Sequence, residues 1–121
     1  MSEPDNLLNV AIAALEELKA RNIEVINVSS LSSIMDTLVI ASGTSNRQIK
    51  ALANQVMVKA KEHGFIPMGV EGTEQAEWVL VDLGDIVVHI MTPATREFYD
   101  LEGLWQAYSN NESNPASNED S

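Results

Sequence analysis

The sequence predicts a single layered α/β domain, in which helices pack on a mixed β-sheet. Two apolar runs, 78–81 and 86–91, flank the Asp-Leu-Gly-Asp segment 82–85, and this pattern is typical of a β-hairpin. Both runs are apolar at nearly every position, so we expect helices on one face and partial cover, such as a partner, on the other. The predicted order is helix, strand, strand, helix, strand, strand, strand, helix.

Length and composition limit the class of protein. The 121 residues suit one domain, predicted over 1–108, followed by an acidic polar tail, 109–121, that we expect to be disordered. The absence of Cys excludes a disulfide scaffold, thiol catalysis and Cys-ligated zinc. The apolar runs are too short to span a bilayer, and the first residues carry acids where a targeting peptide carries bases. We therefore expect a cytoplasmic protein that has no membrane contact.

The charge is unevenly distributed along the chain. The net charge is -11; residues 1–61 hold six acids and six bases, whereas residues 62–121 hold twelve acids and a single base, Arg96. Such a field disfavours direct nucleic-acid binding and speeds encounter with a basic protein or a cation. Acidity that serves only solubility is the alternative interpretation.

Helical periodicity over 7–18 predicts the first helix, with Asp5 as its cap and Lys19 and Arg21 near its last turn. The pair Ser45 and Gln48 forms a capping-box pattern at the start of a second helix, which ends at His63-Gly64. Short strands are predicted over 23–28, 37–41 and 68–72.

The last predicted helix begins at Thr92-Pro93, a cap followed by a first-turn proline. Gly103 weakens this helix by about 1 kcal/mol relative to Ala. Its predicted apolar side consists of Phe98, Leu101, Leu104, Trp105 and Tyr108.

The loop 42–45 lies between a predicted strand and a helix N-terminus, where backbone N–H groups could hold a phosphate, with Arg47 close by. The loop lacks the Lys of a P-loop and the repeated glycines of a dinucleotide fingerprint. We therefore favour a simple turn and helix cap at this position.

Carboxylates around the hairpin raise the question of a divalent-metal site. Asp82 and Asp85, with Asp36 on another segment, resemble the acids of a nucleotidyltransferase. Acids paired on one strand face lie two residues apart, whereas these are three apart across a turn. We therefore expect solvated carboxylates or a surface for basic side chains, with no metal and no cofactor.

Single side chains give little support for catalysis. His89 lies in an apolar run with no second His nearby, which favours a hydrogen-bonded structural histidine. The motifs G-x-S-x-G and H-E-x-x-H are absent. Trp78 and Trp105 suit the core, but Trp78 between acidic neighbours also suits an interface anchor. These observations favour a binding module.

Several motifs together cover most of residues 7–108. They are Asp36, the run 43–48 (GTSNRQ), Gly64 with Pro67, the run 69–72 (GVEG), the run 78–85 (WVLVDLGD), Val88-His89, the run 96–102 (REFYDLE) and Leu104-Trp105. On these motifs the chain resembles the Iojap-like family of ribosomal silencing factors.

The resemblance implies a nucleotidyltransferase-like shape without catalytic acids, and binding in place of turnover. It implies a protein that binds the large ribosomal subunit through ribosomal protein fourteen, blocks joining of the small subunit and represses translation when nutrients are limiting. It also implies homodimers.

Carried over by position, the resemblance implies a contact strip in which Trp78 is the anchor, Asp82 and Asp85 face Lys or Arg, and Gly84 permits the turn. The full set is Trp78, Asp82, Leu83, Gly84 and Asp85, with Glu71, Met91 and Tyr99 as neighbours. Two alternatives stay open. One is a nucleotide- or metal-dependent nucleotidyltransferase-like enzyme that uses Asp36, Asp82, Asp85 and the Gly43 loop, and the other is a dimeric acidic adaptor.

Overall fold

The structure, a computed structural model, describes residues 3–33 and 35–105. Its helices and strands follow the predicted order and confirm the predicted α/β class. They are α1 (Glu3–Glu17), β1 (Arg21–Asn27), β2 (Thr37–Ser42), α2 (Asn46–Glu62), β3 (Gly69–Glu71), β4 (Trp78–Asp82), β5 (Ile86–Met91) and α3 (Pro93–Tyr99). No helix in these two ranges is long and apolar enough to cross a bilayer.

The five strands form one mixed sheet in the order β1-β2-β5-β4-β3. β2 and β5 are parallel, and the other neighbours are antiparallel. The predicted hairpin is confirmed as β4 and β5, and β5 is the central strand. The short strand β3, which lies within the strand predicted over 68–72, forms one edge of the sheet.

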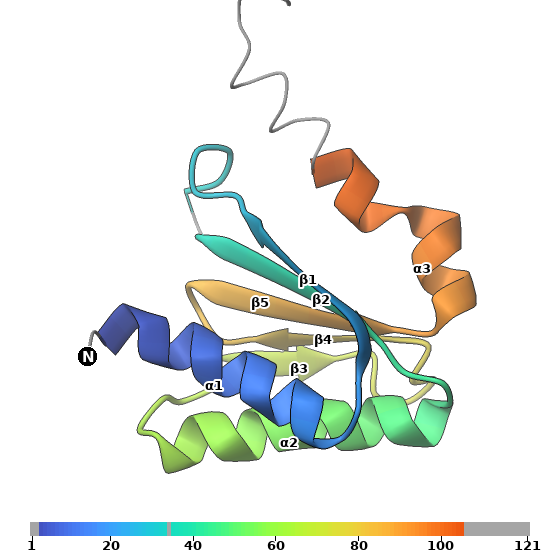
Figure 1. Ribbon diagram of the computed structural model, residues 1–121, viewed down its shortest axis with the longest axis horizontal. Helices are drawn as coiled ribbons and strands as arrows, with labels where there is room; N and C mark the ends of the chain where they lie inside the picture. The colour runs from blue at the N-terminus through green and yellow to red at the C-terminus, as the bar shows by residue number, and fades with distance from the viewer. Residues whose placement is uncertain (1–2, 34, 106–121) are drawn as a thin grey trace, which may run out of the picture.

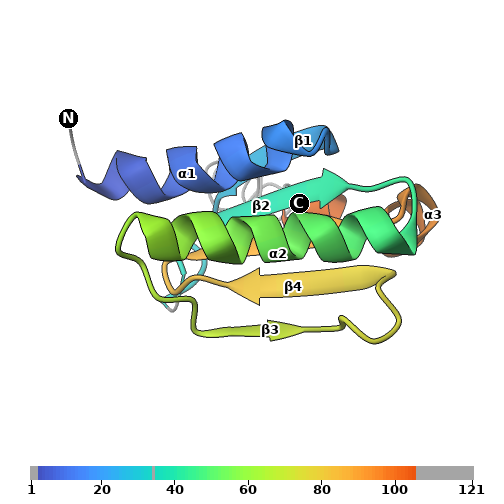
Figure 2. The same ribbon diagram turned by 90° about the horizontal axis from the view of Figure 1, so that it is seen from below.

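The helices α1 and α2 cover one face of the sheet, and α3 lies on the other side (Figures 1 and 2). The main core lies between the two long helices and the sheet, where Ile49 and Val56 of α2 are fully buried with Val79 and Val81 of β4. Because side chains alternate along a strand, Trp78, Leu80 and Asp82 then lie on the opposite face. That opposite face is where most of the predicted contact residues lie.

A second, smaller cluster lies on this opposite face. Its buried members are Ile26, Val28, Leu38, Ile40 and Met91, and Trp78, Leu101 and Trp105 pack against it. The cover is partial, since Leu80 of β4 remains half-buried and Glu71 of β3 is exposed. The part of this face around β3 and β4 is therefore accessible to a partner.

The predicted ends of the first helix are wrong. α1 begins at Glu3, so Asp5 lies inside the helix. Lys19 follows the helix with a positive φ of 64°, and Arg21 already belongs to β1. The chain leaves α1 through this left-handed residue and enters the edge strand at once, which leaves no base in the last helical turn.

The last helix is also shorter than predicted. Thr92 caps it and Pro93 begins it, as expected, but α3 ends at Tyr99 because Asp100 takes a left-handed φ of 49°. A separate helical segment, 101–105, follows. Tyr108 and the tail 109–121 lie outside the described residues.

Asp100 starts the second segment as well as ending the first. Its Oδ1 accepts a hydrogen bond of 3.2 Å from the Gly103 backbone N–H. A Cβ at position 103 would overlap the Asp100 carboxylate, so Gly103 permits this cap. The break leaves Phe98 79% exposed and turns Leu101 and Trp105 onto the second cluster.

Candidate functional site

The side chain of Trp78 is held from two directions. Its indole Nε1–H donates a 2.9 Å hydrogen bond to Nδ1 of His89, which lies on the neighbouring strand β5. Tyr99 lies at the end of α3. The centroid of its ring is 4.9 Å from that of the Trp78 ring, and the two ring planes are inclined at 51°. Trp78 stays half-buried, whereas Tyr99 is 56% exposed. The pair therefore presents an aromatic surface in a fixed orientation.

His89 is a buried, hydrogen-bonded histidine, which confirms the expectation from its apolar strand. It is 8% exposed, and burial lowers its pKa from 6.5 to about 4. A ring nitrogen accepts a hydrogen bond only when it carries no proton, so the bond from Trp78 requires the neutral ring with its proton on Nε2. At neutral pH His89 therefore holds Trp78 without adding charge to the acidic face.

A cleft of about 310 Å³ opens beside these aromatic rings. It is lined by Gly72, Glu74, Gln75, Glu77, Trp78, Thr95 and Tyr99. Gly72 has a φ of 89°, and a Cβ there would overlap the backbone carbonyl of Trp78. Glycine thus allows the connector before β4 to close onto that strand, and the connector carries Glu74 and Glu77 to the cleft.

The hairpin turn lies at the other end of β4. Asp82 Oδ1 accepts a 2.9 Å hydrogen bond from the Gly84 N–H, and Gly84 has a φ of 96°, a conformation that favours glycine. Asp85 is exposed, and its backbone carbonyl accepts hydrogen bonds from the N–H groups of Asp36 (2.7 Å) and Thr37 (3.1 Å). These bonds fix the turn against the start of β2.

A second hollow, of about 440 Å³, adjoins this turn. Its lining residues are Met35, Met68, Asp82, Gly84, Asp85 and Val87. The 73% exposed Met68 and the half-buried Val87 supply apolar surface, while the two aspartates supply negative charge. The mixture resembles the apolar centre and charged rim of many interfaces.

The structure separates the predicted contact strip into two groups. Trp78 and Tyr99 lie at the α3 end, whereas Asp82, Gly84 and Asp85 lie at the hairpin end, four residues or roughly 13 Å along β4. Both groups border the same sheet face, because Trp78 and Asp82 are an even number of residues apart.

The other three predicted residues have different positions. Glu71 of β3 pairs with Leu80 and is exposed, so it lies between the two groups on the same face. Met91 is fully buried in the second cluster, against which Trp78 packs, and Leu83 is 7% exposed within the main core. The side chains of Met91 and Leu83 therefore support the surface and offer little of it to a partner.

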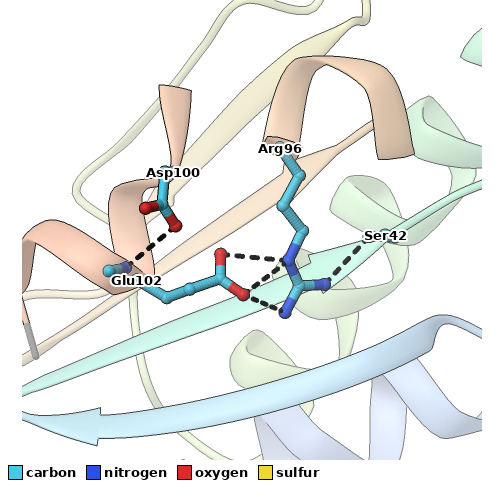
Figure 3. A network of polar contacts seen from close by, with 5 residues as sticks. Ser42, Arg96, Asp100 and Glu102 are labelled. Atoms are coloured by element: carbon cyan, nitrogen blue, oxygen red, sulfur yellow. Dashed lines mark hydrogen bonds and ion pairs between the residues drawn. The ribbon is translucent and has the colours of Figure 1, made fainter. Parts of the chain in front are cut away.

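Sequence reasoning missed the network around Arg96 (Figure 3). The guanidinium donates to Ser42 Oγ (2.9 Å) through Nη1, and it pairs with the Glu102 carboxylate through Nε (3.1 Å) and Nη2 (3.0 Å). The one feature of the sequence that could have indicated this network is that Arg96 is the single base among the twelve acids of residues 62–121. Because the charge of Arg96 is already paired with Glu102 in this buried contact, it does not neutralise the acidic face.

The loop 42–45 uses its polar groups internally. The Gly43 N–H donates to the carbonyl of Met91, and the Thr44 N–H donates to Gln48 Oε1 (2.6 Å). Ser45 Oγ accepts from the Gln48 N–H, so the helix cap is confirmed. The Gln48 side chain accepts from the backbone N–H of Thr44, whereas in a capping box it would accept from the N–H of Ser45. In the described ranges, no group of three or more His, Asp or Glu side chains could hold a metal ion.

The fold and this surface define a small α/β protein with an acidic sheet face around an oriented tryptophan. A family profile described as "Ribosomal silencing factor during starvation" (RsfS) matches residues 1–121. The chain belongs to this family, whose general role is ribosome-associated regulation of translation.

Individual relatives agree with the profile. The ribosomal silencing factor RsfS of Chromobacterium violaceum is 50% identical over 103 residues, covering 85% of this chain and 84% of that protein. A crystal structure of a protein from the same organism superposes with a TM-score of 0.84 at 50% identity, covering 87% of this chain and 88% of that one. The chloroplastic protein Iojap of Zea mays is 37% identical over 92 residues, covering 76% of this chain and 40% of that protein.

Proposed function

We propose that this protein silences translation by binding the large ribosomal subunit through ribosomal protein fourteen and sterically blocking association with the small subunit when nutrients are limiting. Membership of the RsfS family supports the general role. The observation that carries the proposal further is the acidic sheet face, because residues 68–92 contain five acids and no Lys or Arg. Such a face complements a basic ribosomal protein in the cytosol.

The proposed contact surface follows β4 from one hollow to the other. Trp78 and Tyr99 supply aromatic area at one end, and Asp82, Gly84 and Asp85 supply charge and shape at the other, with Glu71 between them. Aromatic anchors in the centre of an interface contribute most of the affinity, whereas charged residues set encounter rate and register. The mechanism is occlusion of a surface, and it requires no catalytic step.

The first test is co-sedimentation of the purified protein with isolated large and small subunits. We expect stoichiometric binding to the large subunit alone. Trp78→Ala should weaken binding by about 2 kcal/mol or more, because a buried aromatic anchor is lost. Unchanged affinity in a folded Trp78→Ala variant would remove Trp78 from the interface.

The hairpin is tested separately by the double change Asp82→Lys and Asp85→Lys. Its matched control is Glu16→Lys with Glu24→Lys, which changes the net charge equally at exposed positions away from β4. We expect the hairpin variant to lose binding and the control to retain it. Equal losses would mean that only net charge matters.

The remaining alternatives have simple tests. A nucleotide- or metal-dependent transferase should be stabilised by about 2.7 kcal/mol at ligand concentrations 100 times the dissociation constant, so a thermal melt with Mg²⁺ and nucleotides separates it from a silencing factor. An acidic adaptor should form dimers but fail to sediment with large subunits.

We propose a homodimer for the free protein, and a mass of 13.2 kDa at all micromolar concentrations would exclude it.

A further inference from the structure

We propose that the cleft between Trp78, Tyr99 and Glu77 binds the side chain of one arginine of the protein partner. This inference rests on the proposed function for the identity of the partner, and it adds the chemistry of one subsite. Three features of the cleft favour this occupant: its aromatic walls, its carboxylates and its size.

The aromatic walls suit a planar cation. The Trp78 and Tyr99 rings lie 4.9 Å apart at 51°, so together they form an angled wall along the cleft. A guanidinium group stacks on aromatic faces and is attracted by their electrons, with Trp the strongest partner. The hydrogen bond to His89 holds the Trp78 ring in place before a partner arrives, which lowers the entropic cost of binding.

The carboxylates of the cleft are not neutralised within the protein. Glu74 and Glu77 are both exposed, and the ion pairs among the described residues are Lys59 with Glu62 and Arg96 with Glu102. Arg96, the single base in residues 62–121, is bound to Ser42 and Glu102 (Figure 3), and neither of these residues lines the cleft. The cleft therefore combines aromatic faces with two carboxylates that lack a cationic partner.

The size and position of the cleft also favour a side chain. About 310 Å³ is at the low end of the range of roughly 300–1,000 Å³ for small-molecule pockets. Gln75 and Thr95 contribute further polar groups to the lining. Arginine fits this combination better than lysine, because its planar fork can stack on a ring and still donate to carboxylates in the same plane.

A titration without ribosomes tests the subsite directly. We would follow the Trp78 indole N–H by NMR, assigned with the Trp105→Phe variant, while adding N-acetyl-arginine amide. Saturable shifts are expected, and Glu74→Gln with Glu77→Gln should reduce the affinity several-fold. Equal affinity for N-acetyl-lysine amide, or for the neutral N-acetyl-citrulline amide, would overturn the choice of arginine.

A second experiment measures large-subunit binding of the same glutamine pair. Its control is Glu16→Gln with Glu24→Gln, which removes the same charge at exposed positions outside the cleft. We expect about a tenfold loss for the cleft pair and less than twofold for the control. Equal effects of the two pairs would overturn the subsite while the proposed function stands. Failure of the unmodified protein to bind large subunits would overturn the proposed function, and the arginine titration would still decide the subsite.

Discussion

At the scale of single residues, the orientation of Trp78 depends on the protonation state of His89. The indole N–H can only donate, and neutral His89 accepts at Nδ1. A protonated ring would place two donors opposite each other in a buried site. The site therefore couples proton binding at His89 to the position of the aromatic anchor.

We predict a specific acid instability from this histidine. Burial lowers the pKa of His89 from 6.5 to about 4, so between these values the unfolded chain binds a proton that the folded chain does not. The contribution of neutral, buried His89 to the free energy of unfolding is fully present above pH 6.5. It decreases as the pH falls and is lost by about pH 4. The full difference is about 3 kcal/mol.

The measurement is the free energy of unfolding by urea from pH 7.5 to 4 for the unmodified protein and for His89→Asn. The variant should show a smaller decrease over this range. His63→Asn is the control, because His63 is exposed at the end of α2. Parallel pH profiles for the unmodified protein and His89→Asn would contradict the prediction.

Two glycines that precede β4 should respond differently to the same substitution. Gly72→Ala should lower the free energy of unfolding by about 2 kcal/mol or more, because the new Cβ would overlap the Trp78 carbonyl at a positive φ. Gly69→Ala meets no atom within 4 Å and should be neutral or slightly stabilising. Chemical denaturation of both variants measures the difference, and similar stabilities would show that the connector can relax.

At the scale of elements, the Arg96 network determines how the end of the chain meets the sheet. Arg96 joins α3 to β2 through Ser42, and Glu102 joins α3 to the helical segment 101–105. The break at Asp100 brings these groups together, since its left-handed backbone ends α3 and bends the chain after Tyr99. Tyr99 is thereby held where it contacts Trp78.

We predict strong coupling between Arg96 and Glu102. Arg96→Met should cost about 2–4 kcal/mol of stability, because it leaves the Glu102 carboxylate without its cation in a largely buried site. Combining it with Glu102→Gln should cost less than the sum of the single changes. The exposed pair Lys59 and Glu62 is the control and should show coupling below about 1 kcal/mol. Additive effects at Arg96 and Glu102 would mean that solvent already screens the pair.

At the scale of the whole molecule, the two faces of the sheet differ in how completely helices cover them. One face is filled by α1 and α2 and supplies the main core, whereas α3 covers only part of the other. The uncovered part coincides with the acidic residues of β3, β4 and their connections. A surface with these properties combines electrostatic steering with local aromatic contacts.

We predict that association with large subunits is strongly dependent on salt. The association rate should fall as ionic strength rises, because screening shortens the range of the acidic field. The double variant Asp82→Lys and Asp85→Lys should associate more slowly and with a weaker salt dependence. Stopped-flow measurements between about 50 and 300 mM salt, a range over which the Debye length shortens roughly twofold, would show this dependence. An association rate that is independent of salt would contradict electrostatic steering.

Much of the fold was predictable because its signals are local. The turn residues 82–85 between two apolar runs indicated the hairpin, Ser45 indicated the start of α2, and Thr92-Pro93 indicated the start of α3. In each case the residues that carry the signal are the residues that form the turn or the cap. The long apolar runs also indicated correctly that both faces of β4 and β5 would be at least partly covered.

The arrangement of the site depended on contacts between distant segments. Ser42 and Arg96 are 54 residues apart, and Trp78 and His89 meet only because β4 and β5 pair in one register. The sequence by itself determined the α/β class, the hairpin, the acidic charge and the family motifs, since composition and local pattern specify these. Only the tertiary structure decided which acids share a cleft with Trp78, why the last helix breaks at Asp100, and which predicted contact residues are buried. Burial and pairing are properties of the packed chain, and neighbours in sequence do not determine them.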